Sequence, residues 1–201
     1  MRSFIALELS AIFKNQLSEQ LQHFKDLHIQ GRYSSVEQLH ITCSFLNDIS
    51  PQQITYVSQI LKTIGATCNQ IPIVPSHLSV FKSGTHKILV LRLCYEKNNE
   101  FKNLMDALEI ALKTYGIPFE KRIFIPHITL IRNAVFPANS NIAQSITQNP
   151  LSDSDSTLLL LPLCTSSSQA SYITLFQSVL SHTGAKYIPL YRVPLRRNNV
   201  I

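Results

Sequence analysis

The sequence lacks tryptophan and has few cysteines. The 10 phenylalanines and 7 tyrosines must therefore supply all of the aromatic packing. The four cysteines, Cys43, Cys68, Cys94 and Cys164, form no Cys-x-x-Cys pair, which argues against a zinc site or a redox motif. We expect Cys43 and Cys94, which lie in apolar runs typical of strands, to pack as small hydrophobic side chains.

Long hydrophobic runs are also absent. The longest late run, residues 158–164, contains Pro162 and falls far short of the roughly 20 apolar residues that a membrane-spanning helix needs. The apolar stretch over residues 1–7 is too short for a signal peptide. We therefore expect a cytoplasmic protein that does not bind a membrane.

Charged residues make up only 15% of the chain, and hydrophobic residues make up 45%. This balance argues against intrinsic disorder, and 201 residues suffice for one sizeable core or for two small lobes that share one. The formal net charge of +6 favours a polyanionic partner, although an incidentally basic protein would have the same composition.

One short pattern occurs twice in the chain. Residues 39–42 read Leu-His-Ile-Thr and residues 126–129 read Pro-His-Ile-Thr, so each copy places a histidine two positions before a threonine. In an extended strand two such residues share a face, and the isoleucine between them points into the packing behind. Two such strands beside one cleft would offer two histidines and two hydroxyls to a phosphate group.

This arrangement suits the hydrolysis of a cyclic phosphodiester, in which one proton leaves the attacking water and another reaches the departing oxygen. An unperturbed histidine pKa of about 6.5 allows either task near neutral pH, so His40 and His127 are candidates for the acid and the base, in an order that the spacing leaves open. The hydroxyls of Thr42 and Thr129 would bind the non-bridging oxygens. The sequence shows no acidic cluster to hold a metal, so we expect neither a metal nor a cofactor.

Two other interpretations of these histidines stay open at this point. A histidine in an apolar strand is more often a core residue than a catalyst, although packing gives no reason to repeat the pattern. Residues 77–79 read His-Leu-Ser and also place a histidine two positions before a hydroxyl, so spacing alone does not exclude this third copy. The remaining histidines lack the pattern and are expected at the surface: His23, His28, His86 and His182.

Hydrophobic periodicity predicts strands and helices in alternation. Apolar residues at helical spacing predict helices over residues 10–27, 50–65 and 100–115, and a short helix over 139–148. Runs with strand character cover residues 2–7, 38–46, 71–81, 87–94, 124–131, 171–180 and 186–195. Serine-rich loops are expected over residues 152–156 and 165–171.

The order of these elements indicates an α+β fold. Strand, helix and motif-bearing strand follow one another twice, and the loops near residues 83 and 183 look like hairpin turns, which favours antiparallel pairing. We predict one bilobal domain over residues 1–201. Its two pseudo-symmetric lobes would carry largely antiparallel sheets flanked by helices, with the active-site cleft between them.

Residues 39–46 and 126–132 resemble the two signature motifs of the two-histidine (2H) phosphoesterase superfamily. Within it, the chain is most similar to the RNA 2′,3′-cyclic phosphodiesterases, also called the 2′-5′ RNA ligase family. The opening strand and the closing hairpin are similar as well, so the resemblance covers nearly the whole chain. It favours the second motif over the copy at residues 77–79.

The resemblance implies a basic cleft and the metal-independent hydrolysis of an RNA 2′,3′-cyclic phosphate to a 2′-phosphate. In the family the first histidine usually gives a proton to the leaving 3′ oxygen and the second takes one from water, so His40 is the expected donor and His127 the expected acceptor. Thr42, Thr129 and Arg132 are the expected phosphate ligands. Arg132 lies five residues after His127, on the opposite face of an ideal strand, and reaches the phosphate only if the strand ends or twists there.

Two further functions fit the same residues. A nucleotide-binding or RNA-binding protein that keeps the fold without catalysis would use the same threonines and the same positive charge. Reversible 2′-5′ RNA ligation would run the reaction backwards. The chain departs from the family at Tyr33, Ser44 and Asn47, which bears on substrate affinity more than on chemistry. We expect a monomer whose partner is an RNA or nucleotide with a 2′,3′-cyclic phosphate end.

Overall fold

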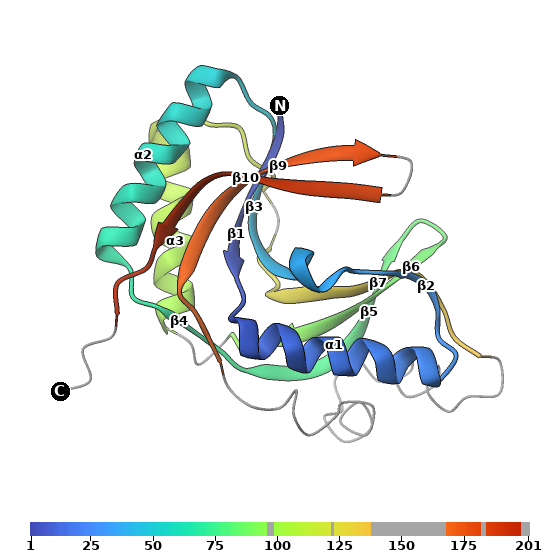
Figure 1. The fold of residues 1–201 in the computed structure, drawn as a ribbon. Helices are drawn as coiled ribbons and strands as arrows, with labels where there is room; N and C mark the ends of the chain where they lie inside the picture. The colour runs from blue at the N-terminus through green and yellow to red at the C-terminus, as the bar shows by residue number, and fades with distance from the viewer. Residues whose placement is uncertain (96–98, 122, 138–167, 182–183, 198–201) are drawn as a thin grey trace.

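The computed structural model describes residues 1–95, 99–121, 123–137, 168–181 and 184–197. The predicted helix over 139–148 and the predicted loop over 152–156 lie outside these ranges. In chain order the elements are β1 (Arg2–Glu8), α1 (Ala11–Asp26), β2 (Gln30–Tyr33), the 3₁₀ helix η1 (Val36–Gln38), β3 (His40–Asp48), α2 (Pro51–Thr67), β4 (Ile71–Ile73), β5 (Pro75–Ser83), β6 (His86–Leu93), α3 (Asn99–Thr114), β7 (His127–Val135), β8 (Ser168–Ala170), β9 (Tyr172–Ser181) and β10 (Gly184–Pro194) (Figure 1).

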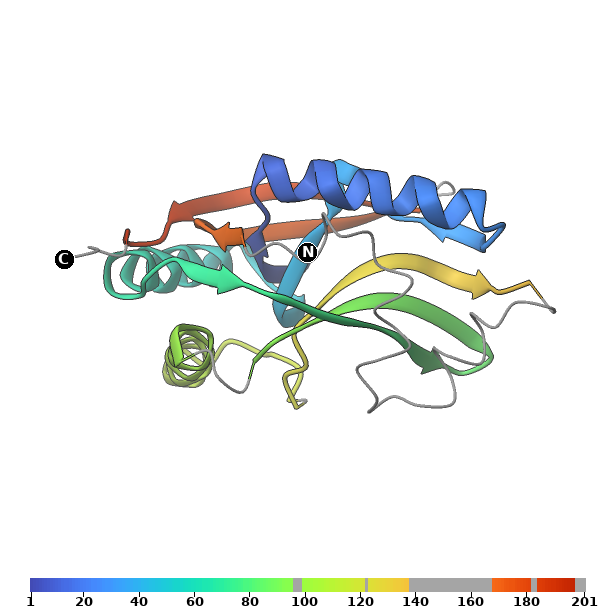
Figure 2. The same ribbon diagram turned by 90° about the horizontal axis from the view of Figure 1, so that it is seen from below.

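Most strands belong to one antiparallel sheet. Its order is β10-β9-β1-β3-β7-β6-β5, and β2 pairs with β7 beside this path. The two strands that carry the motifs, β3 and β7, are joined by a single registered pair, Ile41 with Ile128. The sheet therefore consists of two halves that meet at this pair and splay apart beyond it (Figures 1 and 2). The α+β class and the largely antiparallel pairing are confirmed, with both halves in one continuous sheet.

Helices α1 and α2 begin where the sequence predicts, because their first turns are capped. The hydroxyl of Ser10 accepts a hydrogen bond from the backbone N–H of Phe13 at 3.2 Å. Ser50 and Gln53 form a reciprocal capping box at the start of α2. Helices α2 and α3 lie side by side at one end of the molecule (Figure 1). No helix in the described part of the chain is long and apolar enough to cross a membrane.

The predicted end of α2 at Gly65 is wrong, because the helix continues to Thr67. Gly65 does not end the helix but allows α2 to pack closely against β10. A β-carbon at this position would lie 2.6 Å from the carbonyl oxygen of Pro194 and even nearer to the side chain of Val193. Only glycine therefore allows β10 to approach the helix this closely.

Smaller expectations also differ from the structure. The predicted strand over residues 71–81 is divided into β4 and β5, and the short strand β2 was not predicted. The short strand β8 lies within the predicted loop over residues 165–171. Cys43 is buried as expected, but Cys94 is exposed, because β6 ends one residue before it. Three phenylalanines are fully buried: Phe13, Phe24 and Phe101.

Candidate active site

The two His-x-Thr pairs lie on one face of the sheet where its halves meet. Ile41 and Ile128 are registered partners and fully buried, so the residues that flank them point to the opposite face. Because β3 and β7 run antiparallel, the His40 position falls beside that of Thr129, and the Thr42 position beside that of His127. The structure thus brings the two predicted pairs together.

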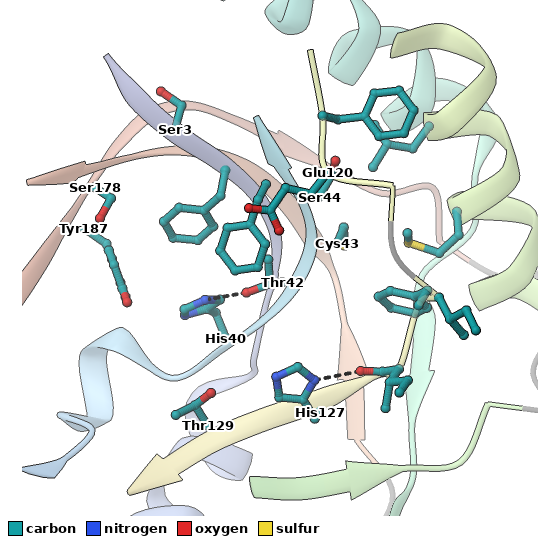
Figure 3. Close-up of a pocket in the computed structure, with 18 of the residues that line it drawn as sticks. Ser3, His40, Thr42, Cys43, Ser44, Glu120, His127, Thr129, Ser178 and Tyr187 are labelled. Carbon is teal, nitrogen blue, oxygen red and sulfur yellow. Dashed lines mark hydrogen bonds between the residues drawn. The ribbon is translucent and has the colours of Figure 1, made fainter. Parts of the chain in front are cut away.

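An opening of about 990 Å³ lies in front of these four side chains. Figure 3 shows His40 and Thr42 on β3, and His127 and Thr129 on β7, around it. In a regular antiparallel ladder His40 and His127 would be diagonal neighbours, which lie about 7–8 Å apart.

The same backbone contact fixes both imidazoles. Nδ1 of His40 donates to the carbonyl oxygen of Gln38 at 2.6 Å, and Nδ1 of His127 donates to the carbonyl oxygen of Ile125 at 2.7 Å. A carbonyl oxygen only accepts, so the Nδ1 proton is held there and Nε2 remains for other partners. Nε2 of His40 lies 3.0 Å from the hydroxyl oxygen of Thr42.

The surroundings favour neutral imidazoles. Burial lowers the pKa of His40 to about 4, and the positive charge of Arg132 adds to this effect, against the hydrogen bond to Gln38. Burial also lowers the pKa of His127, helped by the charges of Arg92 and Arg132. In the ligand-free protein both side chains are therefore mainly uncharged at pH 7.

Aromatic rings hold the His40 imidazole in place from three other strands. The ring centroid of Phe4 lies 5.0 Å away, and Tyr187 meets His40 edge-on at 5.2 Å. Phe176 is more distant, at 6.4 Å. Because these residues come from β1, β9 and β10, the local sequence around the first motif gives no signal for them.

The second histidine has a different neighbour set. The ring of Phe81 meets His127 edge-on at a centroid distance of 4.8 Å. The guanidinium of Arg92 lies 5.7 Å from the centre of the Phe81 ring, and Arg92 is the registered partner of His127 on β6. Within the described residues Nε of Arg92 is buried and has no hydrogen-bond partner. A partly buried cation thus lies beside the second histidine.

A β-bulge brings Arg132 to the opening. Thr129 pairs with Val90 and Ile131 pairs with Leu89, so Leu130 has no partner on β6 and the alternation of faces is reset. Arg132 consequently lines the opening together with His127. The condition set by the sequence, that the strand must end or twist before Arg132, is therefore met by the bulge, and the role of Arg132 as a phosphate ligand stays a prediction.

The first motif contains the equivalent bulge. On β3, Thr42 pairs with Ala6 and Ser44 with Ile5, which leaves Cys43 without a partner. Phe45, five residues after His40, therefore occupies the position that Arg132 has in the second motif, and it also lines the opening. The two halves are alike in backbone but differ in charge at this position.

The third His-x-hydroxyl copy lies elsewhere. His77 is on β5, hydrogen-bonds to the hydroxyl of Ser76 at 2.9 Å and is not among the residues that line the opening. The choice of the second motif over this copy agrees with the geometry. Among the described residues no group of three or more His, Cys, Asp or Glu side chains is placed to hold a metal ion.

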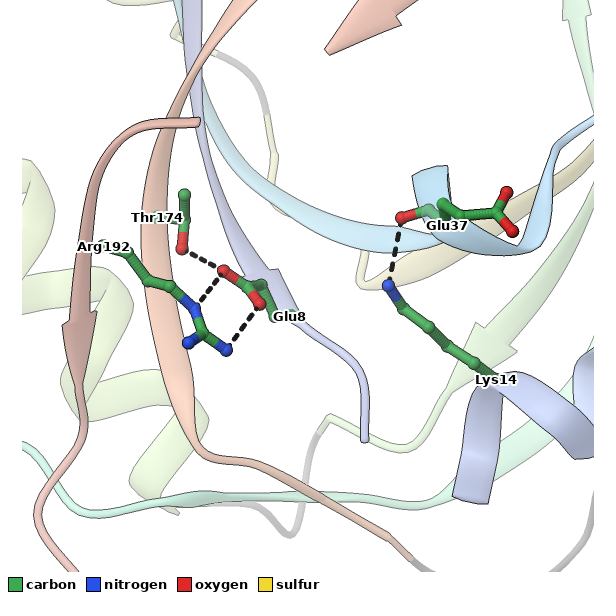
Figure 4. Close-up of polar contacts among 5 residues, drawn as sticks. All are labelled: Glu8, Lys14, Glu37, Thr174 and Arg192. Carbon is green, nitrogen blue, oxygen red and sulfur yellow. Dashed lines mark hydrogen bonds and ion pairs between the residues drawn. The ribbon is translucent and has the colours of Figure 1, made fainter. Parts of the chain in front are cut away.

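A polar network ties together the strands on the His40 side. Glu8, the registered partner of His40, accepts hydrogen bonds from Arg192 at 2.9 and 3.0 Å and from the hydroxyl of Thr174 (Figure 4). Burial alone would raise the pKa of Glu8, but these two partners hold it below its usual value. The network joins β1, β9 and β10. Nearby, Nζ of Lys14 donates to the carbonyl oxygen of a residue in η1 at 3.0 Å.

Comparisons with known proteins agree with this architecture. No protein-family model matches the chain. The RNA 2′,3′-cyclic phosphodiesterase of Thermotoga maritima is 28% identical over 142 residues, which cover 68% of this chain and 72% of that protein. The RNA 2′,3′-cyclic phosphodiesterase of Aquifex aeolicus is 26% identical over 133 residues, or 66% of this chain and 70% of its own.

Solved structures show the same fold. The apo form of LigT from E. coli superposes with a TM-score of 0.67 at 21% identity over 97% of both chains. The protein TT0787 of Thermus thermophilus gives a TM-score of 0.73 at 20% identity, over 98% of this chain and 100% of the other. The chain thus shares its fold with LigT, and its sequence is similar to those of two RNA 2′,3′-cyclic phosphodiesterases.

Proposed function

We propose that this protein hydrolyses RNA ends that carry a 2′,3′-cyclic phosphate to 2′-phosphomonoesters, without a metal ion. The observation that supports it best is the convergence of two histidines and two threonines on one face around the Ile41–Ile128 pair. Two relatives bear the name of this activity, and LigT has been crystallised with the nucleotide 3′-AMP.

An in-line reaction requires a particular spacing of the two histidines. Water attacks phosphorus opposite the departing ribose oxygen, so the two proton transfers occur on opposite sides of the phosphoryl group. Two hydrogen bonds of about 3 Å across such a group require imidazoles roughly 6–9 Å apart. A diagonal pair on adjacent antiparallel strands, at about 7–8 Å, meets this requirement.

In this proposal His40 donates a proton to the leaving 3′ oxygen and His127 accepts one from water. His127 is ready for its task, because its pKa is lowered and its Nδ1 proton is held by Ile125. His40, with a pKa of about 4, must first gain a proton. Thr42, Thr129 and Arg132 would bind the non-bridging oxygens, where charge develops in the transition state.

The negative charge of the bound substrate can favour the protonation of His40. A phosphodiester anion about 4 Å from the imidazole stabilises the charged form by about 4 kcal/mol at an effective dielectric constant of about 20. This energy corresponds to about 3 pKa units. The pKa of His40 would rise from about 4 toward neutrality. Once one imidazole is charged, repulsion keeps the other neutral, so the bound state contains one acid and one base.

Turnover of a nucleoside 2′,3′-cyclic phosphate in the presence of a chelator tests the proposal. His40→Ala and His127→Ala should each lower kcat by at least about 10²-fold, the lower end of a general acid or base contribution. His77→Ala is the matched control, because this histidine has the same sequence pattern but lies away from the opening. Full activity of His40→Ala or of His127→Ala would refute the assigned chemistry.

A second candidate function is nucleotide binding without turnover. The low pKa of His40 favours it. A neutral imidazole whose proton is held at Nδ1 has no proton at Nε2 to give to the leaving oxygen. Tight binding of a nucleoside 2′-monophosphate by a protein that turns over no cyclic phosphate would establish this alternative. We also propose that the protein acts as a monomer, which sedimentation at working concentration would test.

A further inference from the structure

A second opening adjoins the histidine pair on the side of β2 and the β9–β10 hairpin. Its volume is about 510 Å³. His40, Thr129 and Arg132 line both openings, so a molecule bound between the histidines continues directly into this space.

Three cations from three strands surround this second opening: Arg32 on β2, Arg132 on β7 and Lys186 on β10. Arg32 and Arg132 are registered partners across the β2–β7 pair. Like charges directly opposite each other on antiparallel strands are destabilising. Among the described residues no carboxylate lines the opening, and none pairs with any of these three cations. Within that part of the chain the local positive charge therefore has no acidic partner.

The Arg32 side chain reaches across to the hairpin. Its Nη1 would lie 3.6 Å from a β-carbon at Gly184, so the guanidinium lies over the face of β10 to which that β-carbon would point. Lys186 is two residues further along the same strand and shares that face. The two cations thus flank the opening from opposite halves of the sheet.

The other end of the cleft has a different character. Asp106, Glu109, Glu120 and Lys121 line it, together with apolar side chains that include Phe124 and Met105, and Glu109 is paired with Lys113. This end carries charges of both signs and an apolar surface on which a base can pack. The second opening, lined by cations and no described carboxylate, is the better site for a phosphate.

We propose that the second opening binds a further phosphate of the substrate, the one on the 5′ side of the terminal nucleotide. A cyclic phosphate closes the 3′ end of an RNA, so any additional phosphate of the chain lies 5′ of the terminal ribose. The protein would thereby distinguish an RNA end from a lone nucleoside cyclic phosphate. This inference rests on the proposed function, because it places the cyclic phosphate between His40 and His127.

The test compares two substrates that differ by one phosphate: a nucleoside 2′,3′-cyclic phosphate and the same compound with a 5′-phosphate. In the wild-type protein the 5′-phosphate should raise kcat/KM by about tenfold or more, mainly through KM, because charge-assisted hydrogen bonds to phosphate are strong. In Arg32→Gln this ratio should fall close to one, and in Lys186→Gln it should fall in part. Lys62→Gln removes an equal charge from α2 and should preserve the ratio.

A wild-type ratio near one, or an unchanged ratio in both Arg32→Gln and Lys186→Gln, would overturn the inference while leaving the proposed hydrolysis intact. If neither compound is turned over, the hydrolysis proposal fails instead. In that case calorimetry with a nucleoside 2′,5′-bisphosphate and the corresponding 2′-monophosphate tests whether the second opening binds a phosphate. Tighter binding of the bisphosphate that is lost in Arg32→Gln supports the inference, and equal affinities in the wild type contradict it.

Discussion

The protonation of His40 should depend on whether a phosphate occupies the cleft. In the free protein burial holds its pKa near 4. A bound phosphate monoanion about 4 Å away should raise that pKa by about 3 units. At pH 6 the ring should therefore change from about 1% protonated to about 90% protonated when a nucleoside 2′-monophosphate binds.

Nuclear magnetic resonance of ring-labelled histidine measures this change directly. The His40 signal is assigned by its loss in His40→Asn and titrated with and without the nucleotide. The parent nucleoside, which lacks phosphate, is the matched control and should leave the His40 pKa near its free value. A free pKa close to 6.5, or a shift of less than one unit on nucleotide binding, would refute the account of how the acid becomes charged.

Three further changes test other parts of the structure. Arg92→Gln removes the cation beside His127, so the pKa of His127 should rise and the acidic limb of the kcat/KM profile should move to higher pH; an unmoved limb would show that Arg92 has no influence there. Gly65→Ala forces a β-carbon against Pro194 and should reduce the free energy of unfolding in urea by about 1–3 kcal/mol, unless β10 shifts freely. Ser50→Ala removes the capping box of α2 and should lower the free energy of unfolding by about 1 kcal/mol in the same assay. No measurable decrease would show that water replaces the hydroxyl fully.

The paired motifs could be predicted because their signal is local. A period of two places His40 with Thr42, and His127 with Thr129, whatever the rest of the chain does. The starts of the helices were also predictable, since a capping serine followed by apolar residues at helical spacing is contained in one short segment.

Residues that reach the site from distant strands could not be found in this way. Tyr187 and Phe81 contact the two histidines through non-local pairing, which no short sequence pattern encodes. Arg132 is an intermediate case. Two adjacent apolar residues, Leu130 and Ile131, interrupt the alternation of apolar and polar residues before Arg132. Such an interruption in a strand sequence indicates a β-bulge. The prediction of a cytoplasmic monomer stays a prediction.

The single backbone pairing between β3 and β7 has a mechanical consequence. If one half of the sheet rotates against the other about the Ile41–Ile128 contact, displacement grows with distance from that pivot. The catalytic candidates are immediate sequence neighbours of the pivot, so their mutual spacing changes least. Arg32 and Lys186, which line the second opening from the two halves, lie further from the pivot than the histidines do and would move more. Such a hinge would let the mouth of the groove adjust to nucleic acids of different shape without disturbing the proton-transfer geometry at its base.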